Sequence, residues 1–325
     1  MKKTIVAFSR VNPEMLRPYE NDYNIIILKP ELGDMDAQLR DALPQAHGMI
    51  GGNRRLGESE LALAPHLEIV SSISVGYDNY DLAYLSKRGI MLTNTPEVLN
   101  ETTADLAFAL ILATARRIPE LDAWVRGGGW SKGIDESRFG CDVHGKTLGI
   151  IGLGNIGAAI ARRGRFGFGM HILYSGKRRK PELEQELGAR FVSQEELLRQ
   201  SDFVCPVVPL SAETRGLIGS AQLEMMKPEG ILINVSRGAV VDEPALIAAL
   251  EKQRIRAAGL DVYAKEPLPE SPLFAMSNVV VVPHIGSATR ETREGMAKRA
   301  LHNLLMGLSG QKPQDLVNPE VFPTA

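Results

Sequence analysis

The chain has 325 residues, which predicts about two domains, and its composition is that of a globular protein. Its 37 Lys and Arg residues against 39 Asp and Glu give a formal net charge of −2, which argues against nucleic acid or an anionic membrane as a partner. Its two cysteines, Cys141 and Cys205, form no CxxC or Cys/His motif, which predicts no metal site and fits a reducing, cytoplasmic location.

Short β-branched runs alternate with helix-compatible stretches along the first 99 residues. Five candidate strands lie at 4–8, 24–28, 48–52, 67–74 and 90–95. This alternation is typical of βαβ units and a parallel sheet. We therefore predict a parallel α/β domain here.

A long helix is predicted next, with Glu101 in its first turn, Arg116 and Arg117 at its end and a break at the three glycines 127–129. Its apolar body, residues 106–115, is much shorter than the ~20 residues of a membrane span, so it indicates a buried helix and no membrane partner. Residues 130–147 show no clear periodicity, which in a compact protein indicates a functional loop or an interface.

A second series of candidate strands begins at Thr147. Its members lie at 147–152, 171–174, 202–208, 231–235, 257–263 and 279–282. The four valines of the last strand, closed by Pro283, are typical of a strand buried on both faces. A final amphipathic helix over 291–310 is closed by Gly310. The sequence thus predicts two α/β sheets.

The sequence GLGNIG satisfies the GxGxxG pattern with Gly152, Gly154 and Gly157. It follows a predicted strand and precedes a predicted helix, which is the context of a dinucleotide-binding turn. Gly152 permits the tight turn, Gly154 lets the backbone approach the pyrophosphate, and Gly157 lets the helix pack on the strand. A glycine-rich turn without a ligand is the weaker alternative.

The end of the next strand indicates which dinucleotide binds. An NAD-specific fold places Asp or Glu there for the ribose 2′-hydroxyl, but here Ser175 stands at that position. Four basic residues follow it, Lys177, Arg178, Arg179 and Lys180, and a guanidinium matches a phosphate bidentately. We expect NADPH as the preferred cofactor and NADH as a weaker one. The alternative is a solvated basic turn that binds nothing.

Three charged residues follow strands of the second series: Arg237, Glu266 and His284. Ligands of open α/β sheets bind beyond the carboxyl ends of the strands, so parallel strands would bring these side chains to one crevice. Each residue alone has a structural alternative, namely a surface ion pair for Arg237, a turn before Pro267 for Glu266, and a strand cap for His284.

Together these three residues suit hydride transfer to a 2-keto acid. A ketone that gains hydride needs a proton at its oxygen, which His284 would donate, while the Arg237 guanidinium would hold the neighbouring carboxylate. Glu266 would stabilise the imidazolium and fix its orientation.

The chain resembles the D-isomer-specific 2-hydroxyacid dehydrogenases. Four segments carry the resemblance, in this order along nearly the whole chain: TLGIIGLGNIGAAIARR, SRGAVVDEPAL, AAGLDVYAKEPL and PHIGSATRETR. Within the family it is most similar to the glyoxylate/hydroxypyruvate reductase and 2-ketogluconate reductase branch, which shares SISVGYDN (72–79) and generally prefers NADPH.

The resemblance implies the same roles for Arg237, Glu266 and His284, and it adds further site residues. It implies that the backbone amides of Val75 and Gly76 bind the substrate carboxylate. It implies cofactor contacts at Asn155, Ile156, Pro209, Thr214, Asp261 and Gly286, in addition to the glycines and the basic residues above.

The fold implied by the resemblance is α/β with two Rossmann-like domains. A cofactor domain, 100–289, would be inserted into a split substrate domain made of 1–99 and 290–325. Residues 127–147 would form an arm that embraces a second subunit of a homodimer.

Several alternatives stay open. Formate dehydrogenases of this family carry Gln where this chain has Glu266, which argues against them. An NAD-dependent phosphoglycerate-type dehydrogenase and a nucleotide-sensing, corepressor-like binding protein share the fold and much of the triad. The sequence does not rank glyoxylate, hydroxypyruvate and 2-ketogluconate as substrates.

Overall fold

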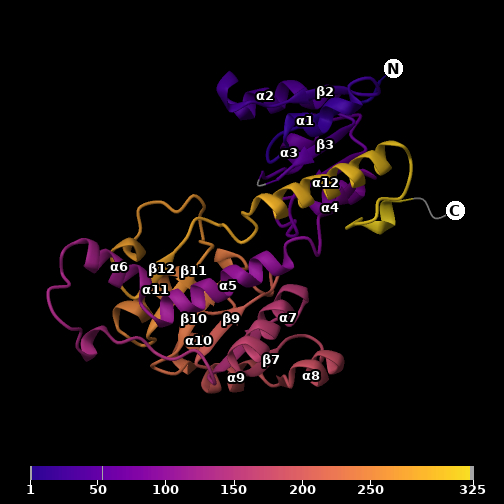
Figure 1. The fold of residues 1–325 in the computed structure, drawn as a ribbon. Coiled ribbons are helices and arrows are strands. Elements are labelled where there is room, and N and C mark those ends of the chain that lie inside the picture. The colour runs from indigo at the N-terminus through magenta and orange to yellow at the C-terminus, as the bar shows by residue number, and fades with distance from the viewer. Residues whose placement is uncertain (1, 53, 323–325) are drawn as a thin grey trace. The chain divides into compact units, whose positions relative to one another are not determined.

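The computed structural model describes residues 2–52 and 54–322 (Figure 1). It divides into two compact units, which we call unit 1 (1–99 and 288–325) and unit 2 (100–287). Unit 2 is continuous in sequence and interrupts unit 1. Its first boundary coincides with the expected one, and its second lies two residues before the expected one.

Unit 1 is built on a five-stranded parallel sheet. Its strands are β1 (Thr4–Ala7), β2 (Asn24–Ile27), β3 (Gly48–Gly51), β4 (Ile69–Ser72) and β5 (Met91–Thr93), arranged in the order β2-β1-β3-β4-β5. Every residue of β1, β3 and β4 is buried, as expected for central strands covered on both faces.

Five α-helices accompany this sheet in the described part of unit 1: α1 (Pro13–Leu16), α2 (Met35–Ala42), α3 (Glu58–Leu61), α4 (Leu82–Lys87) and α12 (Arg290–Leu308). Figure 1 shows α12, near the end of the chain, beside strands from its beginning. Gly48 allows this packing, because a Cβ there would lie 2.8 Å from Leu304 Cδ1 of α12. The last helix is therefore part of the core of unit 1.

Unit 2 is built on a seven-stranded parallel sheet. Its strands are β6 (Thr147–Ile151), β7 (His171–Ser175), β8 (Arg190–Phe191), β9 (Phe203–Pro206), β10 (Ile231–Asn234), β11 (Ala257–Leu260) and β12 (Val279–Val281). The order β12-β11-β10-β9-β6-β7-β8 reverses direction between β6 and β9, which is the point where doubly wound sheets bind ligands. The predicted α/β class with two parallel sheets is confirmed.

Seven α-helices belong to unit 2: α5 (Asn100–Ala115), α6 (Ile118–Arg126), α7 (Asn155–Arg162), α8 (Pro181–Leu187), α9 (Gln194–Gln200), α10 (Ser220–Met225) and α11 (Glu243–Glu251). Helix α5 packs against β10, β11 and α7, and its buried face includes Ala104, Phe108 and Ile111. The apolar run at 106–115 is thus a core helix.

Two local expectations need correction. The helical stretch expected between Glu101 and the glycines 127–129 consists of two helices, α5 and α6, which are separated at Arg117, whose φ is 55°, with Pro119 in the first turn of α6. Proline cannot continue a preceding helix, because it lacks an N–H and its ring clashes with the turn before it. The valine run forms β12, which is an edge strand with only Val279 fully buried, so it is less covered than the composition indicated.

No described helix, in 2–52 or 54–322, is both long enough and apolar enough to cross a membrane.

Candidate active site

The three charged residues follow three neighbouring strands of unit 2. Arg237, Glu266 and His284 come after β10, β11 and β12, which lie side by side at one end of the sheet order. Because the strands are parallel, their carboxyl ends lie along the same edge of the sheet.

His284 and Glu266 form a direct pair. The imidazole Nδ1 lies 2.5 Å from Glu266 Oε2, and both side chains are about one-third exposed, at 35% and 33%. The other carboxylate oxygen, Oε1, accepts the backbone N–H of Tyr263 at 3.1 Å. This pairing orients the ring and leaves Nε2 for a substrate.

Opposing effects act on the pKa of the Glu266 carboxyl. Burial raises its pKa, but the hydrogen bond and charge of His284, the Tyr263 amide and the charge of Arg237 together outweigh burial and lower the pKa below its ordinary value. Glu266 is therefore an anion near neutral pH, and its charge lies against the His284 ring.

The backbone of His284 is also held in place. Its φ is 52°, a left-handed conformation that is uncommon for a residue other than glycine, and its N–H donates to Asp261 O at 3.0 Å and Val282 O at 3.1 Å. The Asp261 carboxylate accepts the next two amides, of Ile285 at 2.6 Å and Gly286 at 2.9 Å. Asp261 thus ties the end of β11 to the loop that carries His284.

Asp261 is almost fully buried. Burial raises its pKa to about 6, although the Ile285 amide and the nearby His284 charge act in the opposite direction. Gly286 completes the arrangement, because its carbonyl accepts the Thr103 hydroxyl at 3.0 Å and a Cβ on it would lie 3.2 Å from Asp261 Oδ2.

Arg237 occupies a tightly packed turn after β10. The Asn234 side-chain amide donates to Arg237 O at 3.0 Å, and Arg237 NH1 donates to Ser236 O at 2.9 Å. A Cβ on the adjacent Gly238 would lie only 1.8 Å from the Tyr263 carbonyl carbon. Glycine at 238 is therefore required for the turn to pack against the segment that leads to Glu266.

The glycine motif forms the turn from β6 to α7. Gly152 has φ 100°, and a Cβ there would lie 2.4 Å from Val207 O; a Cβ on Gly157 would lie 2.4 Å from Gly152 O. A Cβ on Gly154, by contrast, would meet nothing within 4 Å. Two glycines therefore serve packing, while the third keeps a space open at the first turn of α7, where Asn155 and Ile156 begin the helix. This arrangement fits a pyrophosphate.

A pocket of about 220 Å³ joins this turn to the basic run. It is lined by Gly152, Leu153, Gly154, Gly176, Lys177, Arg178 and Lys180. The hydroxyl of Ser175, which ends β7, is buried and has no hydrogen-bond partner among the described residues. The small, uncharged Ser175 and the cationic pocket wall fit a ribose that carries a 2′-phosphate.

Pro209 and Thr214 lie in the segment after β9, next to the point where the sheet order reverses. The Thr214 hydroxyl donates to Pro209 O at 2.6 Å and accepts the Ser211 N–H at 2.8 Å. Their visible role is to shape this segment, and neither lines the pocket described above.

Val75 and Gly76 belong to unit 1, in the loop after β4. The Val75 carbonyl accepts the Asn94 side-chain amide at 2.9 Å. Within residues 2–52 and 54–322, neither backbone N–H donates a hydrogen bond, so both are available donors.

The sequence pattern identified Lys180 among the basic residues that follow β7, but it did not identify Gly176 as a pocket residue. It also left out Glu213, which forms an ion pair with Lys177. No sequence signal points to Glu213, because it lies 36 residues from its partner.

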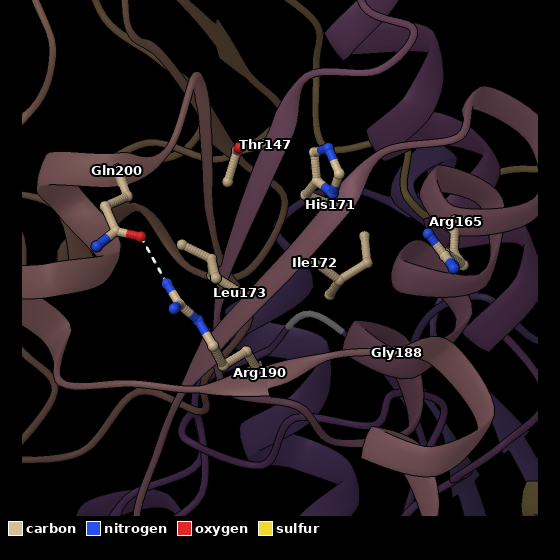
Figure 2. A pocket seen from close by; sticks show the side chains of 8 residues that line it. All are labelled: Thr147, Arg165, His171, Ile172, Leu173, Gly188, Arg190 and Gln200. Carbon is tan, nitrogen blue, oxygen red and sulfur yellow. Dashed lines mark hydrogen bonds between the residues drawn. The ribbon is translucent and has the colours of Figure 1, made fainter.

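A second pocket, of about 350 Å³, lies at the other end of the sheet strands (Figure 2). It is lined by Thr147, Arg165, His171, Ile172, Leu173, Gly188, Arg190 and Gln200, and includes none of the predicted site residues. Figure 2 shows Arg190 donating to Gln200, at 2.6 Å. Thr147 and His171 begin β6 and β7, so this pocket is at the amino ends of the strands and away from the catalytic edge.

No group of three or more His, Cys, Asp or Glu side chains in the described part of the chain is placed to hold a metal ion.

The sequence matches a known family. Residues 108–286, all within unit 2, match the family model described as D-isomer specific 2-hydroxyacid dehydrogenase, NAD binding domain. The chain is 47% identical over 325 residues to a glyoxylate/hydroxypyruvate reductase B of Yersinia pestis, and the match covers 100% of both proteins.

Solved structures agree with this match. A Thermus thermophilus protein has a TM-score of 0.87 and 39% identity, covering 97% of this chain and 99% of that one. An NADPH-dependent glyoxylate/hydroxypyruvate reductase from Sinorhizobium meliloti, in complex with NADP and malonate, has a TM-score of 0.86 and 31% identity, covering 100% of this chain and 99% of that one.

Proposed function

Because this chain belongs to the D-isomer specific 2-hydroxyacid dehydrogenase family, we propose that it reduces a small 2-keto acid to the D-2-hydroxy acid with NADPH as the preferred cofactor. As a member of that family it is an oxidoreductase that uses a nicotinamide dinucleotide. The candidate substrates are glyoxylate, hydroxypyruvate and 2-ketogluconate, and the first two are supported by the names of its relatives. The observation that carries the proposal is the His284–Glu266 pair, at 2.5 Å, in the unit that contains the glycine turn.

The triad residues have distinct tasks in this proposal. His284 donates a proton from Nε2 to the ketone oxygen, and the Glu266 anion stabilises the imidazolium before that transfer. Arg237 binds the substrate carboxylate through its planar guanidinium. The free amides of Val75 and Gly76 are proposed as further donors to the carboxylate.

The cofactor residues are proposed from the glycine turn and the pocket beside it. Gly152, Gly154, Asn155, Ile156 and Gly157 would hold the pyrophosphate at the first turn of α7. Ser175, Lys177 and Arg178 would surround the ribose and its 2′-phosphate, and Pro209, Thr214, Asp261 and Gly286 would complete the site. When bound, the dihydronicotinamide supplies the hydride.

We further propose a homodimer that uses residues 127–147 as an arm. Helix α6, which leads into the arm, has no fully buried residue. Five large apolar side chains are exposed on α6 and the arm together: Ile118, Val125, Trp130, Ile134 and Phe139. Exposed apolar side chains gathered on one segment are typical of a protein interface.

A cytoplasmic location is also proposed. Its support is that Cys141 and Cys205 are both free thiols, as is usual in a reducing compartment.

The deciding experiment is the initial rate of NADPH and NADH oxidation with glyoxylate, hydroxypyruvate and 2-ketogluconate, for the wild type and for His284→Ala. We expect turnover that is faster with NADPH and that falls by roughly 10²–10⁴-fold in the variant, with NADPH binding retained. His302→Ala, which changes an exposed histidine of α12, is the matched control. A wild type that binds NADPH but reduces none of the three acids would contradict the proposal and favour a binding or sensing role.

A further inference from the structure

The four basic residues after β7 differ in their ion pairs and in whether they line the pocket. Arg179 forms a two-pronged ion pair with Glu184 of α8, with Nε–Oε1 and NH2–Oε2 distances of 3.1 and 2.6 Å. The Tyr174 hydroxyl donates to the same carboxylate at 2.5 Å. The hydrogen bonds from Arg179 and then Tyr174 lower the pKa of Glu184 to about 2. Arg179 is therefore occupied by this network, and it does not line the pocket at the glycine turn.

Lys177 and Arg178 do line that pocket, but their surroundings differ. Within residues 2–52 and 54–322, the Arg178 side chain makes no hydrogen bond or ion pair. Lys177 Nζ instead contacts Glu213 Oε2 in a hydrogen-bonded ion pair. Glu213 lies in the segment after β9, directly before Thr214. A lysine of the basic wall is therefore already held by a carboxylate from a different part of unit 2.

We propose that Glu213 is a specificity-determining residue that weakens the preference for NADPH by competing with the 2′-phosphate for Lys177. This inference rests on the proposed function, because it concerns the cofactor of that reaction. Glu213 would weaken binding of the 2′-phosphate and would not itself bind it.

Two physical effects support this role. The pair with Glu213 offsets part of the Lys177 charge that would otherwise act on the phosphate, and the Glu213 carboxylate, held against this pocket residue, repels a dianion. The pair is highly exposed, with side-chain exposures of 81% and 68%, so water and salt screen it and the exchange is easy. NADH has a 2′-hydroxyl instead of the phosphate, so neither effect applies to it.

The test is equilibrium binding of NADPH and of NADH, followed by cofactor fluorescence or calorimetry at low and at high salt. The proteins are the wild type, Glu213→Gln, Lys177→Gln and the double variant. Glu251→Gln is the matched control, because it removes one exposed carboxylate of α11 that lines no part of the pocket. Adenosine 2′,5′-bisphosphate and 5′-AMP serve as simpler probes of the same contrast.

We expect Glu213→Gln to tighten NADPH about two- to fivefold at low salt and to change NADH less than twofold, since exposed ion pairs are weak. The gain should shrink at high salt, and most of it should disappear when Lys177 is also replaced. Unchanged NADPH affinity, equal changes for both cofactors, or the same gain in the Lys177→Gln background would overturn the inference. A wild type that binds neither cofactor, or binds both equally, would instead overturn the proposed NADPH preference.

Discussion

At the scale of single residues, the proposed reactivity of this site depends on how charge is placed around His284. Glu266 is pulled toward the neutral form by burial and toward the anion by His284, the Tyr263 amide and Arg237, which together outweigh burial. Asp261 is buried further, has a pKa raised to about 6, and uses its carboxylate for the backbone of the loop that carries His284. Two carboxylates within a short stretch thus have different tasks, one acting on the imidazole and one on the main chain.

Replacing Glu266 by Gln tests the electrostatic half of this arrangement. Gln removes the negative charge that is proposed to stabilise the imidazolium, and its single oxygen can accept either from the ring or from the Tyr263 amide, because its other terminal atom is an NH2 donor. We expect the rate of ketone reduction to fall about ten- to a hundredfold near pH 8 and to recover partly as the pH is lowered.

The measurement is the pH dependence of kcat/KM for the wild type and Glu266→Gln. Glu243→Gln is the control. Glu243 accepts the backbone N–H of Ala264, two residues before Glu266, at 2.9 Å, but it does not contact His284. An unchanged pH profile in Glu266→Gln would mean that the carboxylate only positions the ring.

Asp315 gives a prediction about stability in unit 1. Burial raises its pKa, but the two-pronged pair with Arg299 of α12 (2.7 and 2.8 Å) and the Asn303 amide (2.8 Å) outweigh burial and lower the pKa below 3.8. A lowered pKa in the folded state means that the carboxylate stabilises the fold above pH 3.8, and that this stabilisation is lost as the pH falls through the folded-state value.

We therefore expect Asp315→Asn to lower the free energy of unfolding by about 1–3 kcal/mol at pH 7 and to flatten its decline in acid. Urea unfolding between pH 7 and pH 3 measures both effects. Asp22→Asn, at an exposed position, should follow the wild type. Parallel acid profiles for wild type and Asp315→Asn would show that the pair does not contribute.

At the scale of elements, the turn between β6 and α7 separates packing from binding among its glycines. Gly152 and Gly157 lack room for a side chain, whereas Gly154 has open space in front of it. The same motif therefore contains two glycines that the fold needs and one that we propose the ligand needs.

Two alanine variants distinguish these roles. Gly152→Ala should destabilise the protein by about 1–3 kcal/mol, because φ is 100° and the new Cβ would lie 2.4 Å from Val207 O. Gly154→Ala should leave the melting temperature within about 2 °C but weaken NADPH more than tenfold, because its methyl group would block the approach of the pyrophosphate. Thermal unfolding with and without NADPH measures both. Equal melting temperatures and equal affinities for the two variants would contradict this division.

At the scale of the whole molecule, the feature with the clearest consequence is the exposed apolar stretch 118–139. We expect Trp130→Glu combined with Ile134→Glu to convert a dimer into a monomer, because two charges would have to be buried in the interface. Light scattering after size-exclusion chromatography gives the mass. Leu32→Glu, which replaces an exposed apolar residue of unit 1, is the control and should remain dimeric. A monomeric wild type, or a dimeric double variant, would exclude the arm as the interface.

The sequence alone determined the α/β class, the glycine turn and the three strand ends that carry Arg237, Glu266 and His284. These features follow local rules, because strand periodicity and glycine spacing act over a few residues and parallel strands always bring their carboxyl ends to one edge. The separation of α5 and α6 at Arg117 also follows a local rule, because Pro119 comes two residues later in the sequence.

Only the tertiary structure decided how the charged and polar groups are paired. In the folded chain Lys177 forms an ion pair with Glu213, and Arg179 forms one with Glu184. The Asp261 carboxylate accepts two amides of a loop that is distant in sequence, and β12 lies at the edge of its sheet. Lys177 and Glu213 are 36 residues apart, and Asp261 and Ile285 are 24 residues apart. Which of several like charges pairs with which carboxylate depends on side-chain distances that only the folded chain fixes, even for Arg179 and Glu184, which are close in sequence. Local sequence rules carry no information about those distances, so they identified the basic run but not the task of each residue in it.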